Sequence, residues 1–402
     1  MRLSIVASLA LIVALLCVAG CRKEAATALE APVAATEARP AEAWGCLYEA
    51  DGGVFWLSTS PGSFPVKLLS MRPDEYVNEC AVSSDGRQVA VTTDQGKGQL
   101  VAPAGGQAET LFTAATDAGG LAWSPDGSQL AYGVGGAIYT QKPGQTRVKL
   151  VVAPRVTDLA WSPNGLQIAY GRRAEDDKDL GLWLVPATGG TPRRLVSPSG
   201  DVFGVAELSW SPDGRWLVFL HAWEGGALCF VKPDGTGYRK DVGPAWGDVH
   251  WLGSSEVVYV SMEDEMMTRG VFRCGPLGQP REIVDGKAVT FDLDRAGSLL
   301  VLKNPPDENA EKVIDISIIA NAGVGLSQAW SRKINGNYGT GSWSPDGQTI
   351  AVCVEDEVGK GTLYMAPVMG ELSQRATAMR RILGWAQGVE QPQAGKAALP
   401  AQ

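Results

Sequence analysis

A short motif built around Ser-Pro-Asp-Gly recurs along the chain and limits the folds that are open to it. Two copies that keep the pattern of apolar residues but lack the Ser-Pro-Asp-Gly sequence start at Val249 (VHWLGSSEVVYV) and at Val289 (VTFDLDRAGSLLVL). A period of this kind predicts a repeat architecture, in which each copy is one structural unit. The clear copies are LAWSPDGSQLAY from Leu121, LAWSPNGLQIAY from Leu159, LSWSPDGRWLVF from Leu208, GSWSPDGQTIAV from Gly341 and, in the same frame, CAVSSDGRQVAV from Cys80.

An aromatic position before each turn, called the anchor below, gives the repeat its register. Successive anchors are separated by 41, 38, 49, 41, 40 and 52 residues. Large aromatic side chains at such positions bury extensive surface, so we expect them to pack between neighbouring units rather than to bind a ligand. The anchors are Val82, Trp123, Trp161, Trp210, Trp251, Phe291 and Trp343.

Each unit contains the pattern of several short strands. Proline presets φ at the second turn position, and glycine accepts the left-handed conformation that follows it. The next strand alternates apolar and polar residues, as in QLAYGV, and two further strand-like segments follow. Four strands in about forty residues, repeated, predict an all-β fold, a β-propeller of four-stranded blades. The turn aspartates Asp85, Asp126, Asp213 and Asp346 are expected to accept local backbone hydrogen bonds.

The two ends of the repeat region complement each other. Before the first anchor, GCLYEA, GVFWLS and FPVKLLS have the pattern of second, third and fourth strands without a first. At the other end, Ile382 to Trp385 has the pattern of a first strand, and Trp385 lies 42 residues beyond Trp343. Pairing of the N- and C-terminal strands would close a propeller over residues 44–385 and leave no open sheet edge. This predicts eight blades, with seven as the alternative if the ends do not join.

The N-terminus has the pattern of an export signal. Arg2 precedes an apolar run from Leu3 to Val18, and small residues follow, so residues 1–20 are excluded from the fold. The alternative, a transmembrane helix, would need about 20 apolar residues with flanking anchors. Val18-Ala19-Gly20-Cys21 resembles the lipobox of bacterial lipoproteins, which implies cleavage before Cys21 and acylation of its thiol.

The segments that flank the repeats lack the residues of a core. Residues 21–43 begin with the lipidated cysteine and are rich in Ala, Glu and Pro, which predicts a flexible tether. Residues 386–402 are predicted to be a disordered tail. By the sorting rule of the lipoprotein family, Arg22 after the cysteine implies the outer membrane, facing either the periplasm or the cell surface.

The SPDG units also resemble those of a known group of propellers. They are similar to the WD-repeat-like propeller repeats of TolB-type periplasmic proteins and of the propeller domains attached to prolyl oligopeptidases. The resemblance spans about Trp44 to Trp385 and implies the fold far more specifically than the function. The chain departs from the TolB pattern because it lacks the N-terminal α/β domain and carries a lipobox.

Composition and motifs limit the kinds of partner and reaction that the sequence predicts. The net charge of −9 argues against a nucleic-acid partner, since phosphate binding needs a basic surface. The sequence contains no G-x-S-x-G elbow, no phosphate-binding loop and no H-E-x-x-H helix, and its only histidines are His221 and His250. We therefore predict a protein that is not an enzyme and uses no metal or cofactor. The alternative is a glycan lyase or hydrolase that uses carboxylates at the channel mouth.

The cysteines do not have the number or spacing of a disulfide framework or a metal site. Five remain after Cys17 and Cys21, in an odd number and without metal-ligand spacing, so most are predicted to be small buried apolar residues. One disulfide is possible in an oxidising compartment, and the sequence leaves its pair open. The five are Cys46, Cys80, Cys229, Cys274 and Cys353.

The loops between second and third strands, together with those between blades, supply the candidate binding face. Their acidic clusters and off-anchor aromatic residues predict a rim that attracts a basic protein partner of the envelope, or a glycan, with the chain itself a monomer. The alternative is that these loops are merely solvated. The candidate residues are Asp176, Asp177, His221, Trp223, Trp246, Glu263, Asp264, Glu265, Asp307, Glu308, Tyr338, Glu355 and Asp356.

Overall fold

The computed structural model describes most of the chain from residue 42 onward. Every element in the described part is a β-strand, and none of it is a helix long and apolar enough to cross a membrane. The described residues are 42–113, 117–172, 181–197, 205–221, 226–240, 242–245, 247–264, 267–286, 289–305, 311–320 and 327–389. Residues 1–41 and 390–402, with the predicted signal, Cys21 and most of the predicted tether and tail, lie outside them.

The strands follow one another at short intervals. The first half contains β1 Glu42–Ala50, β2 Gly53–Ser58, β3 Val66–Ser70, β4 Val77–Val82, β5 Val89–Thr93, β6 Gly98–Val101, β7 Glu109–Phe112, β8 Gly119–Trp123, β9 Leu130–Val134, β10 Ala137–Gln141, β11 Val148–Val152, β12 Val156–Trp161, β13 Gln167–Arg172, β14 Gly181–Pro186 and β15 Arg193–Val196. The second half contains β16 Val205–Trp210, β17 Leu217–His221, β18 Ala227–Val231, β19 Val249–Leu252, β20 Glu256–Asp264, β21 Met267–Cys274, β22 Arg281–Asp285, β23 Val289–Leu293, β24 Leu299–Lys303, β25 Val313–Ala320, β26 Ser327–Asn335, β27 Tyr338–Trp343, β28 Thr349–Glu355, β29 Gly361–Pro367 and β30 Ser373–Val389.

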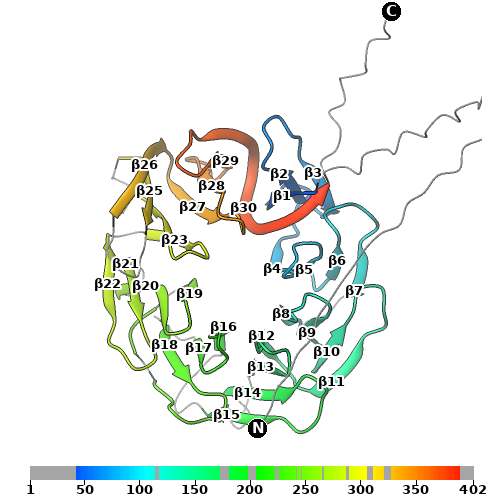
Figure 1. Cartoon of the computed structure of the whole chain (residues 1–402). Coiled ribbons are helices and arrows are strands. Elements are labelled where there is room, and N and C mark those ends of the chain that lie inside the picture. The colour runs from blue at the N-terminus through cyan, green and yellow to red at the C-terminus, as the bar shows by residue number, and fades with distance from the viewer. Residues whose placement is uncertain are drawn as a thin grey trace, which may run out of the picture. The chain divides into compact units, whose positions relative to one another are not determined.

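Consecutive strands form separate antiparallel sheets arranged around a centre (Figure 1). Five sheets have four strands each, and the sheet of β16–β18 has three. In that sheet the segment after β18 replaces a regular fourth strand, with isolated bridges that pair Phe230 with Arg239 and Ala227 with Pro244. The all-β propeller fold predicted from the repeat is confirmed. Each group of sequential strands is called a blade below, and its strands are numbered from the centre outward.

The two ends of the repeat region join in one seven-stranded sheet, in the order β27-β28-β29-β30-β1-β2-β3. The first part of β30 pairs with β29, and its second part, which includes Trp385, pairs with β1. The predicted pairing of terminal strands is therefore confirmed. When β30 is counted in both halves of this sheet, the described strands form eight blades.

Strand β30 also extends past the predicted end of the propeller at residue 385. The Trp56 indole N–H donates to the Ala386 carbonyl at 3.0 Å, and the Gln387 N–H donates to the Gly86 carbonyl at 2.8 Å. These bonds hold the strand in place to Val389.

An ion-paired group secures this closure. The Glu49 carboxylate, 1% exposed, accepts hydrogen bonds from Arg380 at 3.2 Å and from Arg381 at 3.1 Å. Glu49 also accepts the Val77 N–H at 3.1 Å, while Arg381 donates to the Val77 carbonyl. A strand from each chain end is thus joined to β4 of the following blade by charge-assisted bonds, which are among the strongest in proteins.

Five anchor tryptophans link their blade to the one before it. The indole N–H of Trp161 donates to the Ala122 carbonyl at 3.0 Å, one residue before the preceding anchor. Because the same contact recurs at five anchors, it is a property of the repeat and not of one site. The other four pairs are Trp123 with Ala81, Trp210 with Ala160, Trp251 with Ser209 Oγ and Trp385 with Ser342 Oγ.

The Ser-Pro-Asp-Gly turns are stabilised internally. In the turn between β8 and β9 the Ser124 hydroxyl donates to Asp126 at 2.5 Å, and the same carboxylate accepts the Ser128 N–H. These bonds lower the pKa of Asp126 to about 2. Equivalent Ser–Asp bonds hold the turns at Asp85, Asp213 and Asp346, and a Ser–Asn bond holds the turn at Asn164. These three aspartates also accept local backbone N–H groups, as predicted.

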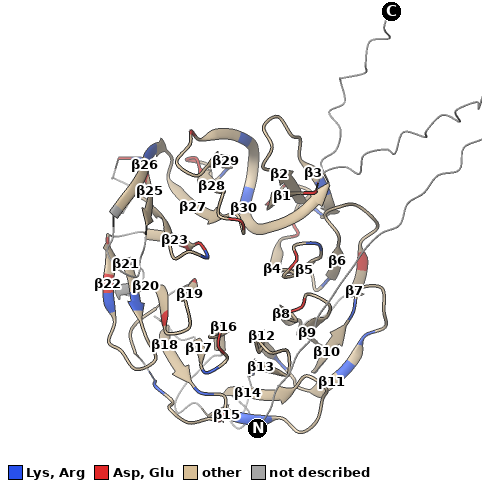
Figure 2. Cartoon of the chain, in the orientation of Figure 1, with Lys and Arg blue, Asp and Glu red and all other residues tan. Residues whose placement is uncertain are grey.

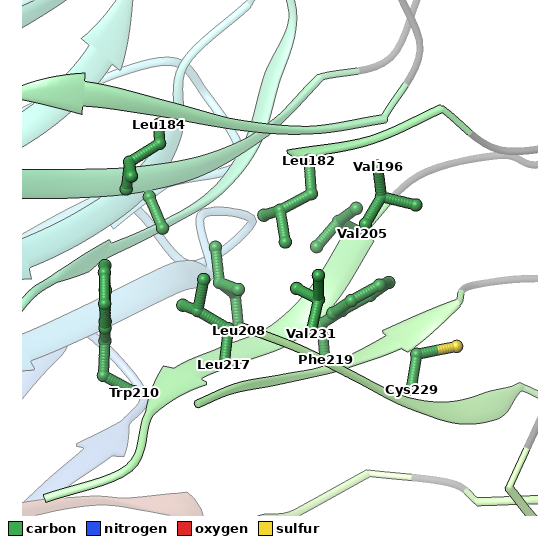
Figure 3. Packing of buried hydrophobic residues seen from close by; sticks show 11 residues of the cluster. Leu182, Leu184, Val196, Val205, Leu208, Trp210, Leu217, Phe219, Cys229 and Val231 are labelled. Atoms are coloured by element: carbon green, nitrogen blue, oxygen red, sulfur yellow. The ribbon is translucent and has the colours of Figure 1, made fainter. Parts of the chain in front are cut away.

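The apolar core lies between neighbouring blades. Figure 3 shows one such cluster, in which Leu182 and Leu184 of one blade pack with Trp210, Leu217 and Phe219 of the next. The cysteines follow the prediction: Cys46, Cys229, Cys274 and Cys353 are buried and Cys80 is partly buried, and all five are free thiols.

The hydrogen bonds of the anchors predict unequal costs for equivalent substitutions. Trp161→Phe removes the indole N–H and leaves the Ala122 carbonyl without that donor. Trp343→Phe removes an indole nitrogen that is buried and has no hydrogen-bond partner among the described residues. We expect Trp161→Phe to lower the free energy of unfolding by about 1–3 kcal/mol more than Trp343→Phe, measured by urea denaturation. Equal losses would show that the indole bonds do not contribute to the stability of the ring.

Candidate functional site

The first strands of the blades face the centre of the propeller (Figure 1). One repeat position on these strands, three residues before the anchor, carries an acid in four blades. Figure 2 shows acidic segments among the strands around the central opening. The four acids are Glu79 on β4, Asp158 on β12, Glu207 on β16 and Asp248 just before β19.

These four acids line one cavity of about 700 Å³. Among its described lining residues Arg381 is the one cation, and that guanidinium is already paired with Glu49. The cavity therefore has four carboxylates and no cation free to balance them. The remaining lining residues are Cys80, Leu121, Thr157, Leu159, Ala206, Leu208, Ser209 and Val249.

Two of the acids also connect neighbouring blades. Asp158 accepts the N–H of Leu208 in the next blade at 2.8 Å and the N–H of Leu159 at 2.7 Å. Glu79 accepts the N–H of Gly120 in the next blade at 3.0 Å. Burial nevertheless raises the pKa of Asp158 to about 7, and it raises the pKa of Glu79 as well. Both side chains therefore contribute to the ring and to the charge of the cavity wall.

The other two acids are more open to the cavity. Glu207 and Asp248 are exposed to water, yet the surrounding protein still raises the pKa of each carboxyl through desolvation. After desolvation, the neighbouring Asp248 raises the pKa of Glu207 further, whereas His250 lowers it. His250 Nε2 lies 4.0 Å from Asp292 Oδ1, so this side of the site also carries an imidazole.

Glu207 has an unusual backbone. Its φ is 51°, in the left-handed region that side chains rarely occupy, and it lies in an irregular part of the pairing between β16 and β17. Gly120, at the same repeat position on β8, has φ 70°. A glycine adopts this conformation at little cost, whereas a residue with a Cβ is strained by about 1–2 kcal/mol. A glutamate in a place that suits glycine is typical of a functional residue.

Three residues of the predicted site lie in the described part on β27, on β28 and directly after β28. Tyr338 is 42% exposed and pairs with Glu355 on the neighbouring strand. Desolvation raises the pKa of its phenol, and the charges of Glu355 and Asp248 raise it further. Burial also raises the pKa of Glu355. Asp356 accepts the N–H groups of Val358 and Lys360 and therefore stabilises its own loop.

The other predicted site residues are placed less fully. His221 is buried on β17, paired with Val205 and Ala227, and is 6% exposed. Glu263 and Asp264 belong to β20, where only the backbone is described. The rest lie outside the described residues: Asp176, Asp177, Trp223, Trp246, Glu265, Asp307 and Glu308.

The cavity acids were absent from the prediction, which considered loops alone. The sequence does contain a signal for them, because Glu79, Asp158, Glu207 and Asp248 all stand three residues before an anchor. Reading each repeat position down the aligned copies, instead of each loop along the chain, would have found them.

No metal centre is formed by these groups. In the part of the chain that the structure describes, no three His, Cys, Asp or Glu side chains lie close enough to hold a metal ion.

Comparisons with known proteins establish the fold. No protein-family model matches the chain, and no curated protein matches it. Among solved structures, the dihydro-heme d1 dehydrogenase NirN in complex with DHE matches with TM-score 0.60 and 18% identity, over 88% of this chain and 78% of that one. A eukaryotic initiation factor matches with TM-score 0.51 and 13% identity, over 86% and 98%. A TolB from Agrobacterium tumefaciens, described as putative in its own name, matches over 60% and 91% with TM-score 0.39 and 18% identity. The likeness to the first two structures, at 18% and 13% identity, extends to the fold and not to the ligand.

The strained backbone at Glu207 predicts a substitution that stabilises the chain. We expect Glu207→Gly to raise the free energy of unfolding by about 1 kcal/mol, because it relieves the positive φ and removes a desolvated carboxyl. Glu282→Gly on the outer strand β22, where φ is not positive, is the matched control and should lower it by about 0.5–1 kcal/mol. Urea denaturation of both variants tests this, and a loss of stability in Glu207→Gly would refute the strain.

Proposed function

We propose that this protein is a non-catalytic binding module whose central cavity receives a cationic group of a partner. The observation that carries the proposal is the cavity of about 700 Å³, whose described lining residues include four carboxylates and one cation that is already paired. Carboxylates that converge on a concave, partly desolvated site focus a negative potential there. A lysine or arginine side chain entering the cavity would neutralise that potential.

A basic protein segment is the partner class that suits this site. Tyr338 and Glu355 lie near Asp248 and would extend the acidic surface beyond the cavity. Exposed aromatic residues beside charged groups are frequent anchors of protein interfaces. The acidic clusters predicted in the neighbouring loops would increase the rate of association with a basic chain.

The location is part of the same proposal. The signal-like residues 1–20 and the lipobox ending in Cys21 support export and acylation, and two or more acyl chains give stable anchoring. The module would then act in the bacterial cell envelope, at the outer membrane.

A second candidate function is acid–base catalysis on a glycan. It is favoured by the pKa of Asp158 at about 7 and by the raised pKa values of Glu207 and Asp248, since a general acid works best near the ambient pH. Both oxygens of Asp158, however, accept backbone N–H groups, which suits a structural role better than proton transfer. Turnover of a polysaccharide that is lost in Glu207→Gln would favour this candidate over the first.

The binding proposal predicts a specific dependence on the cavity acids. Fluorescent hexalysine, followed by anisotropy at low salt, should bind the full chain, and Glu207→Gln combined with Asp248→Asn should weaken it about tenfold or more. The reason is the loss of two of four carboxylates in a site of reduced dielectric. Glu282→Gln combined with Glu371→Gln, two exposed acids of the outer strands and turns, is the control and should change the affinity less than twofold. An equal effect of both double variants would show that binding is non-specific.

The raised pKa values predict that hexalysine binds more tightly as pH rises. The Asp158 carboxyl, with its pKa at about 7, is protonated and neutral at pH 5 and charged at pH 8, and Glu79, Glu207 and Asp248 are shifted in the same direction. The lysine amines, with a pKa of about 10.4, stay charged across this range. Affinity measured at constant ionic strength should therefore increase from pH 5 to pH 8. An affinity that is flat across this range would mean that these carboxyls do not contact the ligand.

A further inference from the structure

The two sides of the propeller differ in what their connections expose. In an antiparallel blade the turns from first to second and from third to fourth strands lie on one side, which we call the turn face. The connections from second to third strands and between blades lie on the other side, the loop face. Tyr338 and Glu355, next to the acidic cavity, belong to the loop face.

Large apolar side chains project from turns of the turn face in four blades. Leu166 is 66% exposed in the turn between β12 and β13, and Leu277 is 82% exposed between β21 and β22. Phe64 is 72% exposed between β2 and β3, and Met369 is 55% exposed between β29 and β30. Single exposed apolar residues are common on proteins and also occur on the loop face, as at Val358, but the tips of several turns on one face can meet an apolar medium together.

Both chain ends attach to this same face. Glu42 begins β1, pairs with Val389 at the end of β30 and forms an ion pair with Arg87 in the turn that follows β4. Only twenty residues separate Glu42 from Cys21, a length that spans at most about 70 Å when fully extended. The turn face is therefore the side from which a chain acylated at Cys21 would reach a bilayer by the shortest path.

The turn face carries charges of both signs. The turn aspartates are engaged by serine hydroxyls and backbone N–H groups of their own turns. Cations stand in the same set of connections, and these can approach lipid phosphates. They are Lys142, Arg147, Lys232 and Arg295, together with Arg87 and Arg215, which are ion-paired with Glu42 and Asp213.

We propose that the turn face rests on the surface of a lipid bilayer, with the tips of Phe64, Leu166, Leu277 and Met369 inserted among the headgroups. The loop face and its acidic cavity then point away from the membrane, open to a partner. This orientation rests on the proposed acylation of Cys21 but not on the proposed cationic ligand, because it concerns the opposite face.

Photo-crosslinking in vesicles tests this orientation. The full chain is incorporated into phosphatidylcholine–phosphatidylglycerol vesicles that contain a diazirine-bearing lipid, irradiated and digested, and the labelled peptides are identified by mass spectrometry. We expect labels on the peptides that contain Phe64, Leu166, Leu277 and Met369. Leu166→Ser combined with Leu277→Ser should reduce labelling of the unaltered Phe64 and Met369 peptides about tenfold, because two inserted side chains are lost.

The control variants test the orientation on the membrane separately from the acyl anchor at Cys21. Val358→Ser, which alters an apolar residue 75% exposed on the loop face, should leave the labelling unchanged. Cys21→Ala should abolish flotation with the vesicles if the acyl anchor is real. Labels on loop-face peptides, or on residues before Glu42 alone, overturn the orientation while the anchor stands. A wild-type chain that does not float overturns both.

Discussion

The pairing of β30 with β1 is the contact on which the arrangement of the inner strands depends. It joins segments more than three hundred residues apart, and Glu49 fixes it by accepting bonds from Arg380, Arg381 and the Val77 N–H of the next blade. This pairing leaves neither β1 nor the second part of β30 as an unpaired edge strand, which would be a site for aggregation. The same closure places Arg381 on the wall of the acidic cavity, so the stability of the ring and the charge of its centre share one residue.

The repeat assigns scaffold and site to neighbouring positions of one strand. Most anchor tryptophans are buried or partly buried and bond to the preceding blade, while the residue three places before the anchor faces the centre. In Asp158 the two roles meet, because its carboxylate accepts N–H groups from its own blade and from the next while burial raises its pKa to about 7. Glu207 carries no such bond among the described contacts and instead has a strained φ, which favours a role toward a ligand.

The sequence predicted the fold well because the repeat supplied many concordant local signals. The SPDG turns, the tryptophan anchors and the orphan strands at each end all follow from turn chemistry and the period of two. The cavity acids were not predicted, because a single acid on a strand resembles an ordinary polar residue until the blades bring four of them together. His221 shows the converse, since its place beside a predicted loop suggested exposure, whereas its strand is buried. The three-stranded sheet of β16–β18 was likewise not evident, because its fourth segment bonds irregularly through Arg239.

The central claim is that a cationic ligand occupies the cavity, and zero-length crosslinking tests it most directly. A carbodiimide joins a lysine amine to a carboxylate only when the two are in contact, so hexalysine can be linked to the full chain and the linked acids mapped by mass spectrometry. The account predicts linkage to Glu207 and Asp248, the two cavity acids that are exposed to water, ahead of Glu79 and Asp158. Linkage confined to acids of the turns and outer strands, such as Glu282 and Glu371, would contradict it.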